Sequence, residues 1–235
     1  MKAVWRTDIG KARGSNQDSL LVLEGPYPLY AVADGMGGHL GGDIASAMAI
    51  KGLKEGARGV KPSEAGIKRL FNGISRDIYL RQLQDSTLSG MGTTLTMLWE
   101  SEREVCLGHV GDSRAYMLRS GELRQLSVDH SLVTELLRSG AIDETTADSY
   151  PYRNVITRAV GAEEEVACDT AVIGKLPGDR FFLCSDGLSE YIKPRQLAAE
   201  LGQPDMEQIA DTLLAAALDL GGRDNITFIL MEVEG

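Results

Sequence analysis

The chain has 235 residues, of which 43% are hydrophobic and 25% charged, an ordinary globular composition with enough length for a sizeable core. Its formal net charge of -10 at pH 7 disfavours binding to the phosphate backbone of nucleic acids. The polar N-terminal residues and the lack of any apolar run of membrane-spanning length argue against a secretory leader and a membrane anchor, so we expect a cytoplasmic protein.

The N-terminal part begins with two short strands and continues with two helices. Apolar runs at 20–23 and 29–33 have the length and composition of strands. A helical pattern follows over 42–55, with Asp43 as its expected N-cap, and a second pattern begins after Ser63, which we expect to cap it. The second helix carries its apolar side chains on one face: Ile67, Leu70, Phe71, Ile74 and Ile78.

Closely spaced strands dominate the middle of the chain. Apolar runs at 93–99 and 105–110 predict two of them. The dipeptide Ser120-Gly121 predicts a hairpin turn between the segments 115–118 and 122–126. A short amphipathic helix is expected over 132–138.

The C-terminal part contains strands at 171–173, 181–184 and 226–233, with a helix after Asp205. The element order is not a regular alternation of strand and helix, so it favours an α+β fold in which amphipathic helices cover mostly antiparallel sheets. No linker-like segment divides residues 1–235, and one domain is expected. The three cysteines are scattered and suit neither a disulfide framework nor zinc; Cys106 and Cys184 are expected to be buried thiols.

Four aspartates stand at the ends of predicted strands. Asp34 ends LYAVAD, Asp112 ends CLGHVGD, Asp186 ends FFLCSD, and Asp224 begins DNITFIL. A tight turn accounts for any one of them, because Asp and Gly are common turn residues. It accounts poorly for four in the same context. If these strands are neighbours, their carboxylates meet and repel one another, a conflict that a bound cation removes.

The ligand types indicate a hard metal ion. The chain has three histidines and lacks the HExxH, CxxC and EF-hand patterns. Ligation by carboxylate, carbonyl and water oxygens suits Mg²⁺ or Mn²⁺. Two such ions that share a carboxylate lie about 3.5–4 Å apart and can activate a bridging water.

The polar segment TDIGKARGSNQD, residues 7–18, offers a candidate anion-binding side chain in Arg13. A guanidinium presents a planar fork that matches phosphate oxygens. The alternative is a solvated arginine in a loop. Asn16, Gln17 and Asp18 could bind metal-bound waters or make turn hydrogen bonds. Four other arginines are expected in structural ion pairs: Arg114, Arg153, Arg158 and Arg223.

Eight stretches occur in a fixed order along nearly the whole chain: TDIGKARGSNQD, YAVADGMGGHLGGDIAS, GMGTTL, GHVGDSRAY, the DH of residues 129–130, RNVITRAVG, FFLCSDGL and GRDNIT. Together they resemble the metal-dependent protein serine/threonine phosphatases of the PP2C (PPM) type, in their compact bacterial form. Each stretch alone is weak evidence for this family, whereas the combination of all eight is highly specific for it.

The resemblance implies a four-layer α/β/β/α sandwich of two antiparallel sheets flanked by helices, with metal ions in a cleft at one end. By matching position, Asp34 would bridge two Mn²⁺ or Mg²⁺ ions and the Gly35 carbonyl would bind one of them. Asp186 and Asp224 would complete the other ion's ligands. Asp112, together with Asp186, would hold a weaker third ion.

The resemblance also implies roles outside the metal ligands. Arg13 would bind the substrate phosphate, Asp18 would act through metal-bound water, and a segment at about 137–158 would form a mobile flap. A metal-bridging water would attack phosphorus in line, with no phosphoenzyme, so Cys184 and Ser185 would not be nucleophiles. The substrates would be phosphorylated proteins, the functional counterpart a serine/threonine kinase, and the enzyme a monomer that binds neither nucleic acid nor membrane.

Three positions depart from the pattern. Met36 stands where many eukaryotic members have a histidine that is the proposed general acid, and Met has no proton to donate. His39 is the nearest replacement; a metal-bound water is another, and His39 could instead be a hydrogen-bonded helix-start residue. Gln17 replaces a frequent Glu, and Tyr150 replaces a histidine that is common in bacterial relatives.

Two other functions remain open from the residues alone. One is a non-catalytic regulatory module of the same fold that binds metal or a phosphopeptide. The other is a phosphomonoesterase for small molecules. The retained aspartates and Arg13 favour an active protein phosphatase, because degenerate relatives tend to lose such residues.

Overall fold

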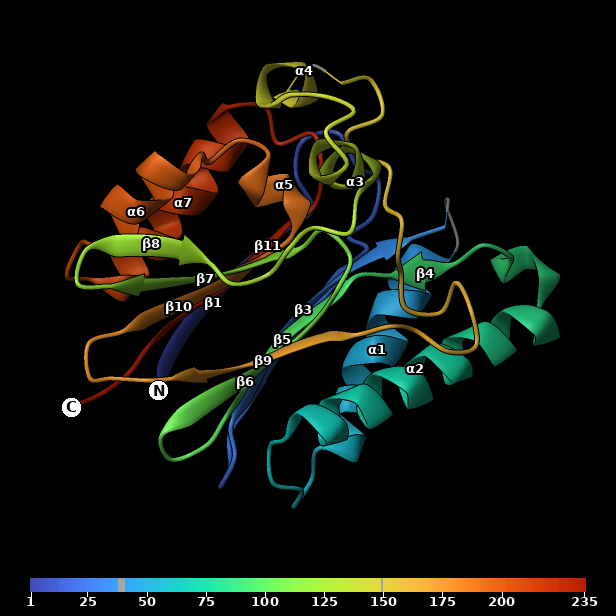
Figure 1. Ribbon diagram of the computed structural model, residues 1–235, viewed down its shortest axis with the longest axis horizontal. Coiled ribbons are helices and arrows are strands. Elements are labelled where there is room, and N and C mark those ends of the chain that lie inside the picture. Colours follow the sequence, from blue (N-terminus) through green and yellow to red (C-terminus); the bar gives the residue numbers. More distant parts are fainter. Residues whose placement is uncertain (38–40, 149) are drawn as a thin grey trace.

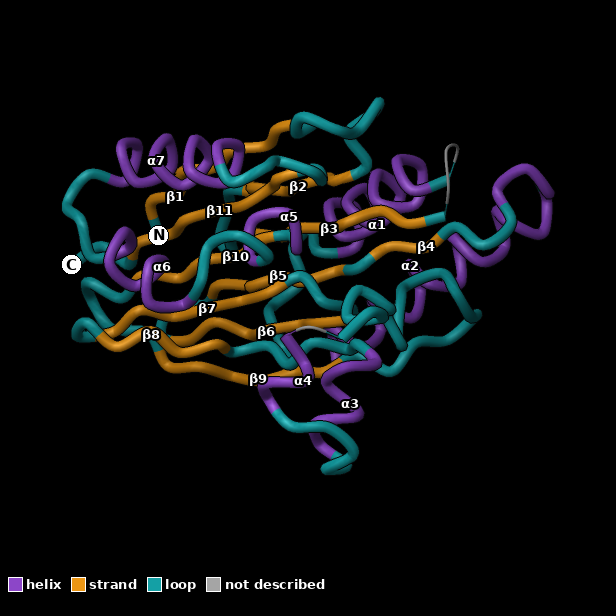
Figure 2. Tube along the Cα trace, turned by 90° about the horizontal axis from the view of Figure 1, so that it is seen from above, coloured by secondary structure: helices purple, strands orange, loops and turns teal. Residues whose placement is uncertain are grey.

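A computed structural model of the chain describes residues 1–37, 41–148 and 150–235. Its strands form two antiparallel sheets that pack face to face, and helices cover both outer faces (Figure 1). Seen from above, the strands of the two sheets run in roughly the same direction (Figure 2), which is the aligned mode of sheet packing. The predicted α+β, four-layer sandwich is therefore confirmed.

Each sheet has a simple antiparallel order. The first sheet runs β1 (Lys2–Asp8), β11 (Ile226–Glu232), β10 (Arg180–Cys184), β7 (Arg114–Arg119) and β8 (Glu122–Gln125). The second runs β2 (Asp18–Leu23), β3 (Leu29–Met36), β5 (Leu95–Glu100), β6 (Glu104–Val110) and β9 (Asp169–Gly174), with β4 (Gly92–Thr93) paired to β3. Because both faces of each sheet are covered, central strands such as β5 are buried along their whole length and read as continuous apolar runs.

The helices form two outer layers. The pair α1 (Gly42–Gly56) and α2 (Glu64–Gln84) covers the second sheet, and α2 continues into a short 3₁₀ helix, η2 (Ser86–Leu88). The first sheet is covered by α5 (Asp186–Ser189), α6 (Pro194–Leu201) and α7 (Met206–Asp219). Two short helices, α3 (Leu132–Arg138) and α4 (Glu144–Asp148), lie outside these layers (Figure 1). Among the described residues, none of these helices is both long enough and apolar enough to span a bilayer.

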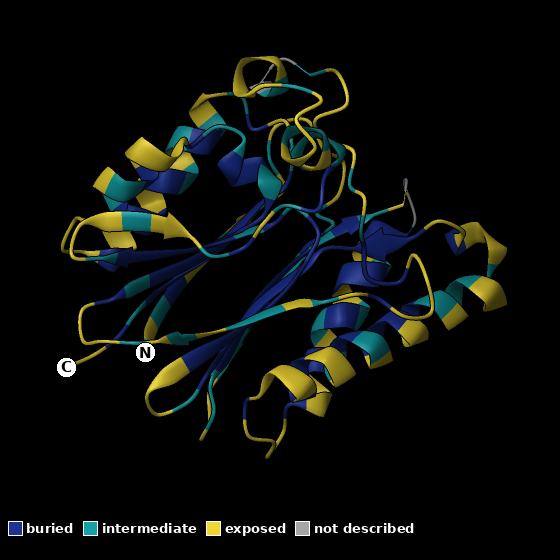
Figure 3. Ribbon diagram, viewed as in Figure 1, coloured by how far each residue is buried: buried dark blue, intermediate teal, exposed yellow. Residues whose placement is uncertain are grey.

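Strand alternation divides the interior into three apolar layers (Figure 3). In β10, Phe181 points between the sheets and Phe182 points to the α6–α7 layer. In β11, Phe228 joins Phe182 with ring centroids 5.4 Å apart, and Ile229 joins the layer between the sheets. Apolar burial of this kind is the main stabilising contribution to the fold.

The N-cap of α1 differs from the prediction, although the helix begins at the predicted Gly42. Gly41 is the N-cap and makes no side-chain cap bond, so the assignment of Asp43 as N-cap is wrong. Gly42 lies against the end of β3, where a Cβ would lie 2.7 Å from the Gly35 carbonyl oxygen. Asp43 instead lies in the first turn, where its charge is favourable to the helix dipole.

Other elements follow the sequence signals closely. The Ser63 side chain accepts a hydrogen bond from the Gly66 N–H at 3.1 Å, as expected of a cap. The hairpin turn has positive φ at both Ser120 and Gly121, which is the backbone of a type I′ turn. The edge strand β1 was not predicted, because its residues are mostly exposed and form no apolar run.

Strand pairing brings one end of both sheets together. Asp18 is directly opposite Asp34 in the β2–β3 register. The last residue of β10, Cys184, pairs with the β11 residue Phe228 on one side and with the β7 residue Arg114 on the other. The chain segments just after β10, just before β11 and just before β7 therefore lie side by side at this end.

Candidate metal centre

A cavity of about 830 Å³ opens at this end of the sandwich. Its walls come from the N-terminal arm, the end of β3, the turn before β7, the start of α5 and the turn before β11. The lining includes most of the residues that the sequence had singled out: Arg13, Asp34, Gly35, Asp112, Asp186 and Asp224. The four aspartates that were separate strand-end signals are thus neighbours in space.

Asp34 and Asp18 lie deepest in this group. Asp18 is buried, and Asp34 is partly accessible from the cavity. Removal from water raises the pKa of Asp34 well above its usual value, and the charges of Asp18, Asp186 and Asp112 raise it further. Burial likewise raises the pKa of Asp18 to about 7, although a hydrogen bond from Ser185 opposes the rise.

Asp112 and Asp186 behave in the same way. Desolvation and the charge of Asp186 raise the pKa of Asp112 to about 8. Desolvation and the charge of Asp224 raise the pKa of Asp186 to about 6, and a hydrogen bond with Asp34 partly offsets that rise. These carboxylates are therefore less stable as anions than they would be in water, because they are removed from water and because their neighbours carry the same charge.

The donor set fits divalent metal ions. Two carboxylate oxygens, Asp18 Oδ1 and Asp186 Oδ1, are buried and have no hydrogen-bond partner in the described part of the chain. An unsatisfied buried carboxylate oxygen is costly, and a hard cation is the partner that such a group suits best. As the side chains stand, no three acidic, histidine or cysteine residues among those described already converge on one ion position.

Arg13 supplies the positive charge in this cavity. Within the described ranges it is the one basic side chain in the lining, and its Nη2 lies 2.5 Å from Asp224 Oδ2. The side chain is half exposed, so its guanidinium also faces solvent at the mouth of the cavity. This placement suits a group that exchanges between a carboxylate and the oxygens of an anion.

The backbone at the cavity floor leaves no room for a side chain. The Gly35 N–H donates to the Gln17 carbonyl at 3.1 Å, and a Cβ at Gly35 would lie 2.7 Å from that oxygen. Gly35 and Gly42 let the end of β3 and the start of α1 approach closely. The glycines in the stretch after Asp34 therefore have a packing reason at least at Gly35.

Two polar residues to which the sequence analysis gave no supporting role hold this end together. Ser185, fully buried, donates its hydroxyl to Asp18 Oδ2 at 2.8 Å. Asn225 accepts from the Gln17 N–H and donates to two carbonyls of the arm that carries Arg13. The sequence signal for Asn225 was its place in the GRDNIT stretch, but only the fold shows that it anchors the arm.

From the sequence we excluded Cys184 as a nucleophile and noted residues that depart from the family's sequence pattern. Their places in the structure are as follows. Cys184 is fully buried and its pKa is raised to about 12, so it is not a reactive thiolate. Met36 lines the cavity, where its side chain has no proton to give. His39 lies outside the described residues. The ring of Tyr150 stands edge-on to that of Tyr152, with centroids 6.1 Å apart.

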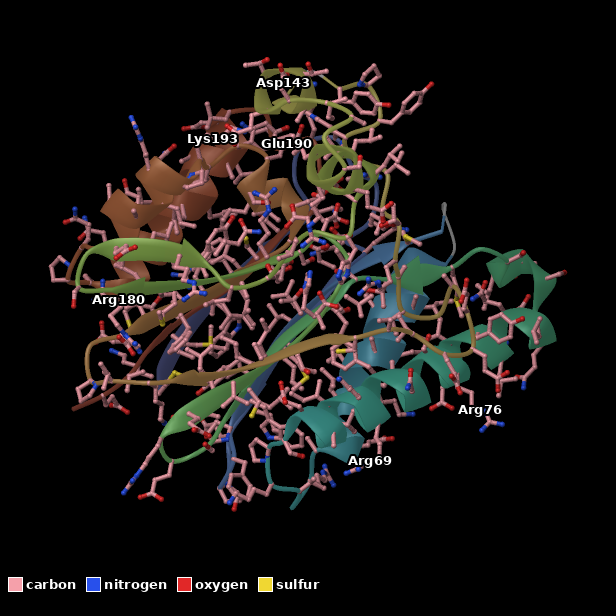
Figure 4. The ribbon with its side chains drawn as sticks, in the orientation of Figure 1. Arg69, Arg76, Asp143, Arg180, Glu190 and Lys193 are labelled. Carbon is pink, nitrogen blue, oxygen red and sulfur yellow. The ribbon has the colours of Figure 1, made fainter. Side chains whose placement is uncertain are left out.

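Three of the four arginines expected in ion pairs have them. Arg114 pairs with Asp129 at 2.6 Å, and Arg158 pairs with Asp169 at 2.8 Å. Arg153 pairs with Glu190, which lies beside α3 and α4 (Figure 4). For Arg223 the described residues provide no ion-pair partner.

Comparisons with known proteins agree with this arrangement. A family profile described as Protein phosphatase 2C matches residues 11–220. The serine/threonine phosphatase stp of Listeria monocytogenes is 37% identical over 241 residues, which cover 99% of this chain and 96% of that protein.

Solved structures are similar over the full length. The serine/threonine phosphatase PstP/Ppp of Mycobacterium tuberculosis superposes with a TM-score of 0.93 at 34% identity, covering 100% of this chain and 99% of that one. The catalytic domain of PstP in complex with two manganese ions has a TM-score of 0.90 at 32% identity, covering 100% and 98%. The chain therefore belongs to the protein phosphatase 2C family of serine/threonine phosphatases.

Proposed function

We propose that this chain hydrolyses phosphoserine and phosphothreonine in proteins and depends on Mn²⁺ or Mg²⁺ to do so. The observation that carries the proposal is the group of mutually repelling carboxylates in one cavity, with Arg13 at its mouth. Titratable groups with pKa values shifted this far, gathered in a cavity, are typical of functional sites. Family membership and the named activities of the relatives support the same chemistry.

Two or three ions would be held by this chain's own oxygens. In the proposal, Asp34 and the Gly35 carbonyl bind the first, and Asp34, Asp186 and Asp224 bind the second. Asp112 and Asp186 bind a weaker third ion, and Asp18 acts from outside through water. When bound, such ions would supply Lewis acidity and make a water a better nucleophile towards phosphorus.

The remaining work falls to side chains around the phosphate. Arg13, at the mouth of the cavity, would bind the phosphate oxygens and stabilise the charge that develops on them. Because Cys184 and Ser185 are buried, the proposal contains no phosphoenzyme. The leaving alkoxide needs a proton, and we assign its delivery to His39 on the basis of sequence position.

The wider setting is part of the same proposal. The enzyme would counteract a serine/threonine kinase, reside in the cytoplasm and act as a monomer. Residues 1–235 would be one catalytic domain, and the segment at about 137–158 would be a flap that influences which substrates enter. The contribution of Asn154 to the cavity lining supports a role for the flap beside the site.

Turnover of a phosphothreonine peptide and of p-nitrophenyl phosphate, each with Mn²⁺, Mg²⁺ or EDTA, tests the proposal. We expect hydrolysis of the peptide with Mn²⁺ or Mg²⁺ and none with EDTA. Equal rates in EDTA would refute metal dependence. No turnover with either metal would instead favour a regulatory module that only binds metal or phosphopeptide, and activity on p-nitrophenyl phosphate alone would favour a small-molecule phosphatase.

The role of His39 has its own test. His39→Gln should slow a phosphoserine peptide, whose alkoxide leaves poorly, about 100-fold, and should hardly affect p-nitrophenyl phosphate, whose phenolate needs no proton. A normal rate on the peptide would leave metal-bound water as the proton donor.

A further inference from the structure

One stretch quoted from the sequence has no part in the proposed chemistry: Asp129-His130, between β8 and α3. His130 is buried, and the Asp129 side chain is largely covered. Both side chains reach the turn at 111–114, which carries Asp112 into the cavity.

His130 holds the residue before Asp112. Its Nδ1 accepts a hydrogen bond from the Gly111 N–H at 3.0 Å, and its own N–H donates to the Gly111 carbonyl at 2.7 Å. Gly111 has φ +109°, and a Cβ there would lie 2.6 Å from the Thr94 side chain, so this turn accepts no other residue easily. The two bonds to His130 therefore fix a turn that has little freedom of its own.

The same ring has a fixed tautomer. Because Nδ1 accepts from an N–H, it carries no proton, and the proton of the neutral ring is on Nε2. Nε2 lies 3.2 Å from Asp169 Oδ2, to which it can donate, and 3.0 Å from Arg158 Nη1, which donates to Asp169 Oδ1 at 2.8 Å. Asp169 thus orients the imidazole in the way that a carboxylate orients a histidine beside a metal site.

Asp129 holds the other side of the turn. Its Oδ2 accepts from Arg114 Nη2 at 2.6 Å and from Nε at 2.9 Å, and its Oδ1 accepts from Gln125 at 3.0 Å. Arg114 is two residues after Asp112, and Gly111 is the residue before it. Asp129 and His130 therefore form hydrogen bonds with residues on both sides of Asp112.

His130 and the next residue, Ser131, also contact residues 156–157. The His130 carbonyl accepts from the Thr157 N–H at 2.8 Å, and a β-bridge joins Ser131 to Ile156. Ile156 and Asn154 line the same cavity as Asp112. His130 therefore contacts both the turn that carries Asp112 and the segment that follows Asn154.

We propose that Asp129 and His130 are positioning residues that hold Asp112 in place for the weakly bound third metal ion. The inference rests on the proposed function, which gives Asp112 that role. It predicts that loss of the Asp129 contact with Arg114, or of the His130 contact with Gly111, weakens the metal binding that depends on Asp112. Metal binding at Asp34 and Asp224 should be unchanged. A purely structural role predicts a loss of stability without a selective effect on metal binding.

The chain offers a matched control on the same strand. Arg119, at the other end of β7, makes a two-point pair with Asp179 at 2.8 and 2.6 Å, much like the pair of Arg114 with Asp129. Asp129→Asn and Asp179→Asn each remove the charge from one such pair. Only the pair of Arg114 with Asp129 lies next to Asp112. A comparison of the two variants therefore separates an effect on the position of Asp112 from an effect on the stability of the fold.

Calorimetric Mn²⁺ titrations of the whole chain test the inference, with Asp112→Asn identifying the weak binding event. We expect Asp129→Asn to weaken that event by about 10- to 100-fold and Asp179→Asn to leave it within about twofold, the range that outer partners of metal ligands produce. The inference is overturned if both variants behave alike, or if the wild type has no weak event that Asp112→Asn removes. This result is independent of turnover, so a wild type that binds metal without hydrolysing the peptide would refute the proposed function alone.

Two replacements of His130 test whether Nδ1 is the ring atom that holds the turn. Asn places an amide oxygen near the position of Nδ1, and Gln places an amide nitrogen near that of Nε2. His130→Asn should keep amide hydrogen exchange at 108–114 near the wild-type rate, with metal binding weakened at most threefold. His130→Gln should accelerate that exchange and weaken the Asp112-dependent event by about 10-fold or more. Equal behaviour of the two variants would overturn the assignment to Nδ1, and should His130→Gln fail to fold, the Asp129 and Asp179 pair decides.

Discussion

The two ends of the sandwich treat acidic side chains in opposite ways. At the end away from the cavity, buried acids have basic partners: Glu100 pairs with Lys175, and Asp179 pairs with Arg119 at 2.6 Å. Arg180 (Figure 4) pairs there with an acid of β11 in the same manner. This end follows the ordinary rule that a charge removed from water is paired.

At the cavity end the rule is broken. Asp18, Asp34, Asp112 and Asp186 have no basic partner within ion-pair distance among the described residues, and Arg13 pairs with Asp224 at 2.5 Å. Carboxylates that repel one another do not stabilise the folded state. They do favour the binding of a cation. The contrast separates acids that are paired within the fold from acids that we propose bind metal.

The largest expected effect separates one acid from each end. Asp34→Asn should lower kcat/KM for a phosphothreonine peptide by about 1,000-fold, because a metal ligand supports several kcal/mol of charge stabilisation. In EDTA the same variant should melt at or above the wild-type temperature, because it removes a charge that its neighbours repel.

Asp179→Asn should do the reverse, losing about 1–3 kcal/mol of stability because Arg119 loses its charged partner, with kcat/KM unchanged. Thermal unfolding and steady-state kinetics check both variants. A large loss of stability in Asp34→Asn without metal would mean that the cavity acids also serve the fold.

A smaller effect is expected at Arg13. Arg13→Ala should lower kcat/KM by about 10- to 100-fold, since a charged hydrogen bond to phosphate contributes roughly 1.5–3 kcal/mol. Calorimetric Mn²⁺ binding should not weaken, because the variant frees Asp224 from its present partner. Weaker Mn²⁺ binding would show that Arg13 shapes the metal site rather than the phosphate site.

The smallest effect concerns pH in the absence of metal. The pKa of Asp186, Asp18 and Asp112 in the folded chain is raised to about 6, 7 and 8, whereas an unfolded aspartate has a pKa near 3.9. The folded state therefore keeps these protons longer, and its stability is lost as pH rises from about 4 through 8.

The melting temperature in EDTA should accordingly fall by a few degrees between pH 6 and pH 8, at about 2–4 °C per kcal/mol for a chain of this size. Asp112→Asn should reduce the fall, and Mn²⁺ should abolish it. A wild-type melting temperature that rises over this interval in EDTA would contradict the charge imbalance.

Much of the fold was predictable because the burial pattern is strong. Phe181 and Phe182 alternate between two apolar layers, and Ser63 carries a clear cap signal. The strand β1 was missed because an exposed edge strand needs no apolar run, and Trp5 on it is 45% exposed. The N-cap of α1 was misassigned to Asp43, although the helix begins at the predicted Gly42, because the capping residue Gly41 makes no side-chain bond that a sequence pattern could show.

The site was predictable as a set of residue types and less so as a geometry. Asp34 and Asp186 have a local signal, a carboxylate at the end of an apolar strand beside glycine. The support from Ser185 and Asn225 has no such signal, because Ser and Asn are common in turns and their partners are far away in the chain. The pairing of Arg13 with Asp224, across 211 residues, likewise follows only from the fold.

Calorimetric titration of the metal-free chain with Mn²⁺, beside Asp34→Asn, tests the central claim most directly. The unbalanced carboxylates predict tight binding of at least two ions per chain in the wild type and loss of that binding in Asp34→Asn. A wild type that binds no Mn²⁺, or a variant that binds it equally well, would contradict the claim that this end of the sandwich is a metal centre.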